Sequence, residues 1–346
     1  MSTLKKLAIG GSLAFVGLRL ARYAIRQSRR FDWQGKRVLI TGASRGLGLV
    51  IARQLADKGA RLAICARSAD DLREAKRQLE AQGAEVHTVP CDVRDRSQVT
   101  EAVRSIEAEL GGIDVLINVA GIIEVGPFDA MTNDDFEDSM ATNCWGALNT
   151  IKEVLPGMKA RGFGRITNIA SMGGKRAVPH MLPYAASKFA LVGLSNGLRA
   201  ELLHENIFVT TACPGLMRTG SPRNAKFKGQ HRYEYAWFSI GDSLPLVSMD
   251  VEQAAAQIIR GCEEGRGEFV VTSPLNIAIH LQSLFPELTR DILALMATVL
   301  PKMGGIGQQA ARGYDSESAA APSFLTELSQ RSARENNQYG YEPPAA

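Results

Sequence analysis

The chain has 346 residues, of which 45% are hydrophobic and 22% are charged, so it can form a core of ordinary size and is not a wholly disordered protein. Its net charge is +4, but residues 1–30 carry seven basic side chains and no acidic one, which leaves −3 for the remainder. The remainder therefore lacks the excess positive charge that is typical of nucleic-acid-binding proteins.

The first thirty residues combine an apolar run with basic side chains. Residues 7–18 are uncharged, and arginines follow at positions 19, 22, 26 and 29, close to one stripe of a helix. Twelve helical residues extend about 18 Å, short of the about 30 Å hydrocarbon core of a bilayer. The apolar run and the arginines of residues 1–30 therefore predict a membrane anchor or an interfacial helix. The alternative is a helix that packs on the protein or on a partner subunit. A secretory signal is the third alternative, although arginines follow the run where a small-x-small cleavage site would stand.

Two features predict a reducing environment on the cytosolic side. Arginines that face anionic headgroups would place the rest of the chain on the cytoplasmic face of a membrane; without membrane contact it would be cytoplasmic. The five cysteines are scattered, with no Cys-x-x-Cys pair and no Cys/His cluster at metal spacing. We therefore expect reduced thiols and no metal site.

From residue 36 to 273, apolar runs alternate with helix-forming segments. Strands are expected at 37–42, 61–66, 85–93, 113–121, 164–171, 207–215 and 268–273, and helices at 47–58, 70–82, 98–110, 134–160, 183–204 and 251–262. Continuous apolar strands separated by helices are typical of a parallel sheet that is covered on both faces. We predict one α/β domain at 36–273, a doubly wound parallel sheet (Rossmann fold) of about seven strands.

A glycine-rich turn joins the first predicted strand to the first helix. The turn reads TGASRGLG at residues 41–48. Glycines allow the backbone to approach a pyrophosphate closely, and the following helix N-terminus offers free N–H groups. A tight turn without a ligand is the alternative, but its position at the start of an alternating fold favours dinucleotide binding.

A tyrosine and a lysine lie four residues apart in a later predicted helix. Tyr184 and Lys188 would share one face of that helix. Such pairs occur by chance on many helix surfaces. The pair alone therefore does not distinguish a catalytic site from a surface contact.

The chain after residue 273 divides into two parts. Residues 274–303 predict an apolar helical extension, broken at Pro286, that covers the substrate cleft, forms a dimer face or touches a membrane. Residues 304–346 are polar and rich in Gly, Ala, Ser and Gln, which predicts a disordered tail with one short helix near 324–328.

The order of these motifs resembles the short-chain dehydrogenase/reductase family over roughly residues 36–273. The resemblance is carried by Gly42, Gly46 and Gly48 in the turn, by Asn-Val-Ala-Gly at 118–121, and by the Tyr-x-x-x-Lys pair that follows Ser171. One difference is Val119, where the family usually has a second Asn; the change removes a polar contact but no catalytic group. The resemblance implies the single-domain branch of the family.

The resemblance also implies a catalytic role for four residues. Tyr184 would be the general acid/base, with its pKa lowered by the ammonium of Lys188 and by the positive ring of an oxidised cofactor. Lys188 would also hold the cofactor ribose. Ser171 would donate a hydrogen bond to the substrate carbonyl, and Asn143 would hold a water that links Lys188 to solvent.

The cofactor implied by the resemblance is a nicotinamide dinucleotide, and the sequence favours NADP(H). No acidic residue stands directly after the second strand, whereas Arg67 stands there and Arg45 lies in the glycine turn, both suited to a 2′-phosphate. A solvated surface role for either arginine is the alternative. Asp92 would meet the adenine. The expected cofactor-binding residues are Gly42, Ser44, Arg45, Gly46, Leu47, Gly48, Arg67, Asp92, Val93, Asn118, Ala120, Gly121, Tyr184, Lys188, Pro214, Gly215 and Thr219.

The loop at 215–250 is expected to close over the substrate. Its aromatic residues are Phe227, Tyr233, Tyr235, Trp237 and Phe238, and Met172, His180 and Met181 could face them from the other side. An aromatic lining with few polar groups suits an apolar carbonyl or alcohol. The basic residues interleaved in the loop suit docking on a membrane or partner equally well.

Three functions from different classes follow from these patterns. The leading hypothesis is an NADP(H)-dependent oxidoreductase that acts on a carbonyl/alcohol pair. A membrane-tethered NADP(H)-binding scaffold or sensor is the second. An epimerase or dehydratase is the third, and the glycine spacing and moderate length disfavour it. The resemblance also implies a homo-oligomer that associates through the helices at 134–160 and 183–204.

Overall fold

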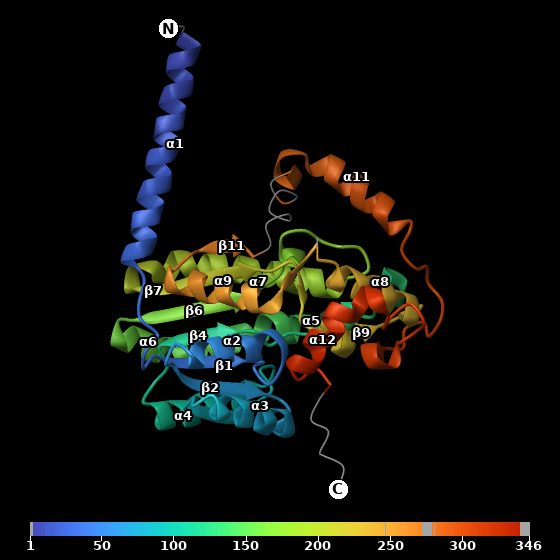
Figure 1. Cartoon of the computed structure of the whole chain (residues 1–346), viewed down its shortest axis with the longest axis horizontal. Coiled ribbons are helices and arrows are strands. Elements are labelled where there is room, and N and C mark those ends of the chain that lie inside the picture. Colours follow the sequence, from blue (N-terminus) through green and yellow to red (C-terminus); the bar gives the residue numbers. More distant parts are fainter. Residues whose placement is uncertain (1–2, 246, 272–278, 280, 340–346) are drawn as a thin grey trace.

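The computed structural model describes residues 3–245, 247–271, 279 and 281–339, and the side chains of residues 16 onward within these ranges. Helix α1 (Thr3–Ser28) projects from a layered body, and α11 (Pro286–Ala297) stands apart from the body on the same side (Figure 1). The body begins at Trp33, whose indole Nε1 donates a buried 2.6 Å hydrogen bond to Oε1 of Glu263 on α9.

Seven parallel strands of the described chain form the central sheet, in the order β11-β7-β6-β4-β1-β2-β3. Their bounds are β1 (Arg37–Thr41), β2 (Arg61–Ala66), β3 (Val86–Pro90), β4 (Val115–Asn118), β6 (Gly164–Ile169), β7 (Ile207–Cys213) and β11 (Glu268–Val270). The predicted doubly wound α/β fold is confirmed, while residues 272–273 of the last expected strand lie outside the described residues.

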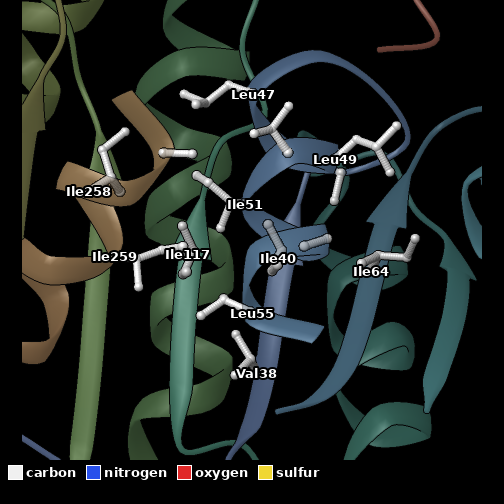
Figure 2. Close-up of a cluster of buried hydrophobic side chains, with 14 of the residues drawn as sticks. Val38, Ile40, Leu47, Leu49, Ile51, Leu55, Ile64, Ile117, Ile258 and Ile259 are labelled. Atoms are coloured by element: carbon white, nitrogen blue, oxygen red, sulfur yellow. The ribbon is translucent and has the colours of Figure 1, made fainter. Parts of the chain in front are cut away.

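Helices cover both faces of the sheet because successive strand residues point to opposite sides. Ile40 belongs to a core formed with α2 (Gly46–Ala56), α3 (Ala69–Ala81) and α9 (Val251–Glu263). Figure 2 shows part of this core, with Ile258 and Ile259 of α9 beside Ile117 of the sheet. Leu39 belongs to the opposite core, with α4 (Arg96–Leu110), α6 (Gly146–Arg161) and α7 (Leu182–Leu202).

The long helix expected at 134–160 is two helices joined by one wide turn. Helix α5 (Asn133–Met140) leads into a π-helical turn, Ala141–Trp145, and then into α6. Turns of this kind offset the backbone hydrogen bonds by one residue and are frequent at functional sites. The turn contains Asn143.

The segment expected to be a substrate loop is largely folded. It holds β8 (Leu216–Arg218), the 3-10 turn Ser221–Asn224, β9 (Lys226–Phe227), α8 (His231–Ser243) and β10 (Ser248–Asp250). Strand β9 pairs with β5 (Glu124–Val125), and β10 pairs with β8. The helix α8 was not expected from the sequence; it forms because Tyr235 and Phe238 pack with Phe227 in a separate small core.

The part of the C-terminal segment that the structure describes is ordered, unlike the disordered tail expected from residue 304. Strand β12 (Ala311–Arg312) pairs antiparallel with β9, and α12 (Glu327–Glu335) packs near α8, extending the short helix expected at 324–328. Ser329 on α12 donates from its hydroxyl to the buried carboxylate of Asp242 at 3.2 Å. Residues 340–346 lie outside the described residues.

The apolar helix expected within 274–303 is present as α11 and does not cover the cleft. Its large side chains stay exposed, such as Leu295 at 69% of its full area, and Val299 in the turn that follows the helix is 82% exposed. In the described parts of the chain, no helix combines the length and the apolar character needed to cross a membrane.

Replacing Ile258 by alanine is expected to lower the free energy of unfolding by about 2–4 kcal/mol, because it opens a cavity in the core between α2 and α9. Val299→Ala, at an 82% exposed position in the turn after α11, is the matched control and should change this energy by less than about 0.5 kcal/mol. Denaturant unfolding of the two variants measures both values. Equal effects of the two substitutions would contradict the assigned core.

Candidate active site

The turn between β1 and α2 is shaped by close backbone contacts. Gly42 has a φ of +68°, and a Cβ at this position would lie 2.7 Å from the backbone of Ala120. At Gly48 a Cβ would overlap the carbonyl oxygen of Gly42. Only glycine fits either position without strain or displacement. The turn therefore brings the start of α2 against the end of the neighbouring strand, as the sequence predicted.

A cavity of about 780 Å³ opens beyond the carboxyl ends of the sheet strands. Its wall includes Gly42 after β1, Arg67 after β2, Val119 after β4, Ser171 after β6 and Pro214 after β7. A site at this edge of a doubly wound sheet is where such folds bind nucleotides. The cavity is long enough to join the glycine turn to Tyr184 on α7, and its glycine-shaped end leaves room for phosphate groups, so the residues present fit a dinucleotide.

Tyr184 and Ser171 face each other at the inner end of the cavity. Burial raises the pKa of the Tyr184 phenol to about 12, although a hydrogen bond with Ser171 acts in the opposite direction. The Ser171 hydroxyl also accepts a 2.9 Å hydrogen bond from the backbone N–H of Gly173. In the protein alone the phenol is therefore protonated at neutral pH. This differs from the expected lowering of its pKa by Lys188, because loss of solvation is the largest effect on the phenol in the protein alone.

Lys188 lies beneath Tyr184 and is buried. Its Nζ donates to the carbonyl of Ile169 at 2.9 Å and lies 5.7 Å from the centre of the Tyr184 ring. Burial lowers the pKa of this ammonium to about 8. A Cβ at Gly121 would lie 3.5 Å from Nζ, an ordinary contact, but 2.8 Å from Oδ1 of Asn143, so glycine is needed there for the placement of Asn143. Lys188 therefore titrates closer to neutral pH than an exposed lysine does, and it lies beside the Tyr184 ring.

Asn143 holds the backbone next to the cavity from behind its wall. Its Oδ1 accepts from the N–H of Ile122 at 2.9 Å, and its Nδ2 donates to the carbonyl of Ile122 at 3.1 Å and to Ser187 at 2.9 Å. The side-chain amide is thus engaged with protein groups. The role expected for Asn143, holding a water that links Lys188 to solvent, stays a prediction.

The two arginines expected to select NADP(H) line the outer part of the cavity. Arg67 is exposed, and Arg45 is half-buried and donates from Nη1 to Oδ1 of Asn224 at 3.2 Å. Burial lowers the pKa of Arg45, and the nearby charges of Arg67 and Arg312 lower it further, whereas Asp71 raises it. The site therefore concentrates positive charge where an anion can bind.

Most of the other expected cofactor-binding residues line the same cavity. They are Ser44, Gly46, Leu47, Gly48, Asp92, Val93, Ala120, Gly121, Pro214, Gly215 and Thr219. Asp92 is held by Arg94, whose Nη2 donates to its carboxylate at 2.7 Å. Asn118 is placed differently, inside the sheet, where its Nδ2 donates to Asn168 at 2.9 Å and its Oδ1 accepts from Thr150 at 2.8 Å. It joins strands and does not line the cavity.

The wall around Tyr184 is mainly apolar. Met172 and Met181, expected there, are joined by Phe238 from α8, and the further apolar members are Ile122, Ile123, Val178, Leu216 and Met217. The remaining expected residues lie elsewhere. Phe227 and Tyr235 are fully buried in the small core and Tyr233 is 67% exposed, while His180 pairs through Nδ1 with Glu234 at 2.8 Å. The buried carboxyl of Asp242 also lines this end, and burial raises its pKa to about 7.

Two residues of the C-terminal segment line the cavity without having been predicted. They are Arg312 and Gln338, which belong to the segment that the sequence predicts to be a disordered tail. The local sequence around them is polar and has no helical or strand period. The pairing of β12 with β9, which joins residues over 80 positions apart in the chain, brings Arg312 to the site, and hydrogen bonds from Asn224 hold Gln338 there.

The comparisons with known proteins agree with this geometry. The family model described as short chain dehydrogenase matches residues 36–228. A putative ketoacyl reductase of Streptomyces coelicolor is 40% identical over 183 residues, 52% of this chain and 70% of the relative. The gluconate 5-dehydrogenase of Gluconobacter oxydans is 36% identical over 189 residues, 55% of this chain and 74% of the relative.

Two solved structures share the fold at similar identity. An actinorhodin polyketide ketoreductase variant with NADPH aligns with a TM-score of 0.63 at 32% identity, covering 69% of this chain and 97% of the neighbour. A gluconate 5-dehydrogenase from Burkholderia cenocepacia in complex with NADP and tartrate aligns with a TM-score of 0.63 at 32% identity, covering 71% and 97%.

Replacing the buried Lys188 by methionine is expected to stabilise the protein near neutral pH. The lysine pKa is about 8 in the folded chain and about 10.5 in the unfolded chain, so between these values the unfolded state binds more protons and the parent gains stability as pH rises. The advantage of Lys188→Met should be roughly 1–3 kcal/mol at pH 7 and decline from pH 8 upward, since one pKa unit corresponds to about 1.4 kcal/mol. Urea unfolding from pH 6 to 10 tests this. A difference that stays constant with pH would refute the buried-charge account.

Proposed function

The chain belongs to the short-chain dehydrogenase/reductase family, and on this premise we propose that it uses NADP(H) to interconvert a carbonyl and an alcohol on an apolar small molecule, with Tyr184 as general acid/base. The chain is an NAD(P)-dependent oxidoreductase. One observation carries the proposal: Tyr184, Ser171 and Lys188 meet at the end of a cavity whose other end is the glycine turn.

The proton chemistry follows from the burial of the phenol. Bound NADPH supplies the hydride to the carbonyl carbon. Tyr184 keeps its proton at neutral pH because its pKa is about 12, and it can give that proton to the more basic alkoxide that forms on the substrate oxygen. A protonated resting phenol suits the reductive direction. Lys188, with a pKa of about 8, can then return a proton to the phenolate.

Ser171 and Asn143 act around this step in different ways. The Ser171 hydroxyl, oriented by its contacts with Gly173 and Tyr184, can donate to the substrate oxygen and stabilise the developing charge. Asn143 does not reach the cavity; it is a positioning residue that fixes the backbone at Ile122 beside Lys188. The four residues of the predicted set are therefore assigned three direct roles and one supporting role.

The preference for NADP(H) is supported by the arginines at the outer end of the cavity. Arg45 and Arg67 line it, and Arg67 follows β2 at the position where an acidic residue would favour NAD(H). Two neighbours of known structure at 32% identity were solved with NADPH or NADP. A 2′-phosphate placed between the two guanidinium groups would offset their mutual repulsion.

The apolar substrate class is supported by the lining of the inner end. Methionine, isoleucine, valine and phenylalanine side chains surround Tyr184 there, and Asp242 is the acidic side chain among the described residues that line this end. Such a surface releases water on binding an apolar molecule and offers few partners to a highly hydroxylated one. The fit favours a hydrophobic ketone or aldehyde over a sugar.

We also propose that the protein docks on an anionic membrane surface. An exposed apolar stripe runs along helix α11 and into the turn after it, and includes Leu288, Ile292 and Leu295 on the helix and Val299 in the turn. Helix α1 projects from the same side of the body (Figure 1), and its sequence has arginines between an apolar run and the body. Apolar residues flanked by cations suit the interface between acyl chains and anionic headgroups.

A homo-oligomer that associates through the segments at 134–160 and 183–204 stays a prediction. Trp145 in the first segment and Phe189 in the second are exposed.

Tyr184→Phe is expected to reduce NADPH-dependent reduction of apolar carbonyl compounds by at least about 100-fold, because no other group supplies the proton. Binding of NADPH should remain within about threefold of the parent, since the phenyl ring keeps the shape of the site. NADPH oxidation with ketones graded in apolar size gives the rates, and fluorescence titration gives the affinity. Retained turnover in the variant would contradict the role of Tyr184. Nucleotide binding without turnover by the parent on every compound would favour the scaffold or sensor hypothesis.

Membrane docking predicts co-flotation of the full chain with vesicles that contain phosphatidylglycerol, and less with phosphatidylcholine alone. The double substitution Leu295→Asp and Val299→Asp should lower the bound fraction severalfold, because it places two charges in the apolar stripe. Phe324→Asp, at an 84% exposed position on the C-terminal segment, should leave flotation unchanged. A parent that does not float with either vesicle would refute the docking proposal.

A further inference from the structure

The C-terminal segment at 304–339 lies across the outer end of the cavity. It runs over α8 and β9 and ends beside the start of α2 (Figure 1). The matched family region ends at residue 228, so this segment lies outside it. The family match therefore does not cover this segment, and its contacts with the rest of the chain define its contribution to the site.

One set of contacts attaches the segment to the glycine turn. The backbone N–H of Gly46 donates to the carbonyl of Asn336 at 2.8 Å, and Nδ2 of Asn337 donates to the carbonyl of Ser44 at 3.4 Å. Arg53 on α2 donates from Nη1 to Oδ1 of Asn336 at 2.9 Å. The segment thus satisfies one of the N–H groups that the N-terminus of α2 leaves open.

A second set attaches the same segment to the opposite wall. Nδ2 of Asn224 donates to the backbone carbonyl and to Oε1 of Gln338, both at 2.8 Å, and Oδ1 of Asn224 accepts from Arg45. Gln338 is buried, and its Nε2 lies 2.5 Å from the position that a Cβ on Gly46 would take. Residues 336–338 therefore bridge the glycine turn and the substrate segment, and Gln338 lines the cavity between them.

Arg312 on β12 adds a third cation to this end. It lines the cavity and donates from Nη1 to the carbonyl of Asn224 at 3.0 Å. Throughout the described residues, no carboxylate lies within 4.0 Å of the guanidinium groups of Arg45, Arg67 or Arg312. The charges of Arg67 and Arg312 both disfavour the charged form of Arg45, with Asp71 as the opposing group. Like charges held together without an adjacent counter-ion favour the binding of an anion.

We infer that residues 304–339 form the outer wall of the NADP(H) site and that Arg312 contacts a phosphate group of the dinucleotide. This inference rests on the proposed function, because it names a further residue for the same cofactor. The phosphate is either the 2′-phosphate of NADP(H) or the diphosphate common to both dinucleotides. Arg312 lies on β12 and not on α2, so the phosphate would be held by the C-terminal segment as well as by residues of the glycine turn.

The test is nucleotide binding by the full chain, measured by fluorescence titration with NADPH and with NADH. Arg312→Gln removes the charge but keeps a donor for the carbonyl of Asn224, and should weaken NADPH binding about tenfold or more, as expected for a lost hydrogen bond to a charged group. Arg312→Lys keeps the charge and should restore part of the affinity. Unchanged NADH binding by Arg312→Gln assigns the contact to the 2′-phosphate, and an equal loss for both nucleotides assigns it to the diphosphate.

Arg331→Gln is the matched control, because Arg331 lies on α12 of the same segment, is exposed and pairs with Glu335 at 2.8 Å. It should bind both nucleotides as the parent does. The affinity of Arg312→Gln should also depend less steeply on salt than that of the parent, a change that a loosened segment alone would not cause.

Two outcomes would overturn the inference. In the first, Arg312→Gln binds NADPH as tightly as the parent. In the second, Arg312→Lys is as weak as Arg312→Gln and the salt dependence of all variants is the same, which would show that the side chain only holds Asn224. A parent that binds neither nucleotide would refute the proposed function itself. Nucleotide binding by the parent is therefore measured before that of any variant.

Discussion

The close approach of the first turn to the neighbouring strand is the constraint on which the site depends. Gly42 lies so near the backbone of Ala120 that a side chain at residue 42 cannot be accommodated, and Gly48 lies equally near the carbonyl of Gly42. Because these contacts hold β1, α2 and β4 together, the strand ends and the helix start form one wall. The cavity begins at this wall, and every residue assigned to the cofactor is positioned relative to it.

At the inner end of the cavity, two ionisable groups are buried at a cost to the stability of the fold, and their burial sets up the proton transfer. An ammonium and a phenol are both removed from water there, and their pKa values move in opposite directions, to about 8 for Lys188 and about 12 for Tyr184. Both shifts disfavour the charged forms, which is the sign of burial and not of an ion pair. At neutral pH the phenol is therefore uncharged and Lys188 is still mostly an ammonium, so Lys188 can give a proton to a phenolate that forms at Tyr184. Perturbed groups of this kind gather at functional sites because folding alone does not require them.

The outer end of the cavity is completed by segments that are far apart in the chain. Arg45 belongs to the first turn, Asn224 to the segment after β7, and Arg312 and Gln338 to the C-terminal segment. Each contact joins residues separated by more than 80 positions. The hydrogen bonds of Asn224 to both sides make it the common point of this wall. Residues 304–339, which follow the matched family region, thus contribute to the wall of the cavity and are not a separate appendage.

The sequence by itself determined the layered fold and the inner site, and the tertiary structure decided how the walls are built. Strand and helix patterns, the glycine turn and the Tyr184–Lys188 spacing are local, so they could be recognised from neighbouring residues. The placement of Asn118 inside the sheet and the engagement of Asn143 with Ile122 depend on partners across the fold. The ordered structure of residues 304–339 could not be predicted from the sequence for the same reason. A polar segment without a helical or strand period folds here through backbone hydrogen bonds with β9 and with the glycine turn. The sign of the Tyr184 pKa shift likewise depends on burial, which only the packed structure supplies.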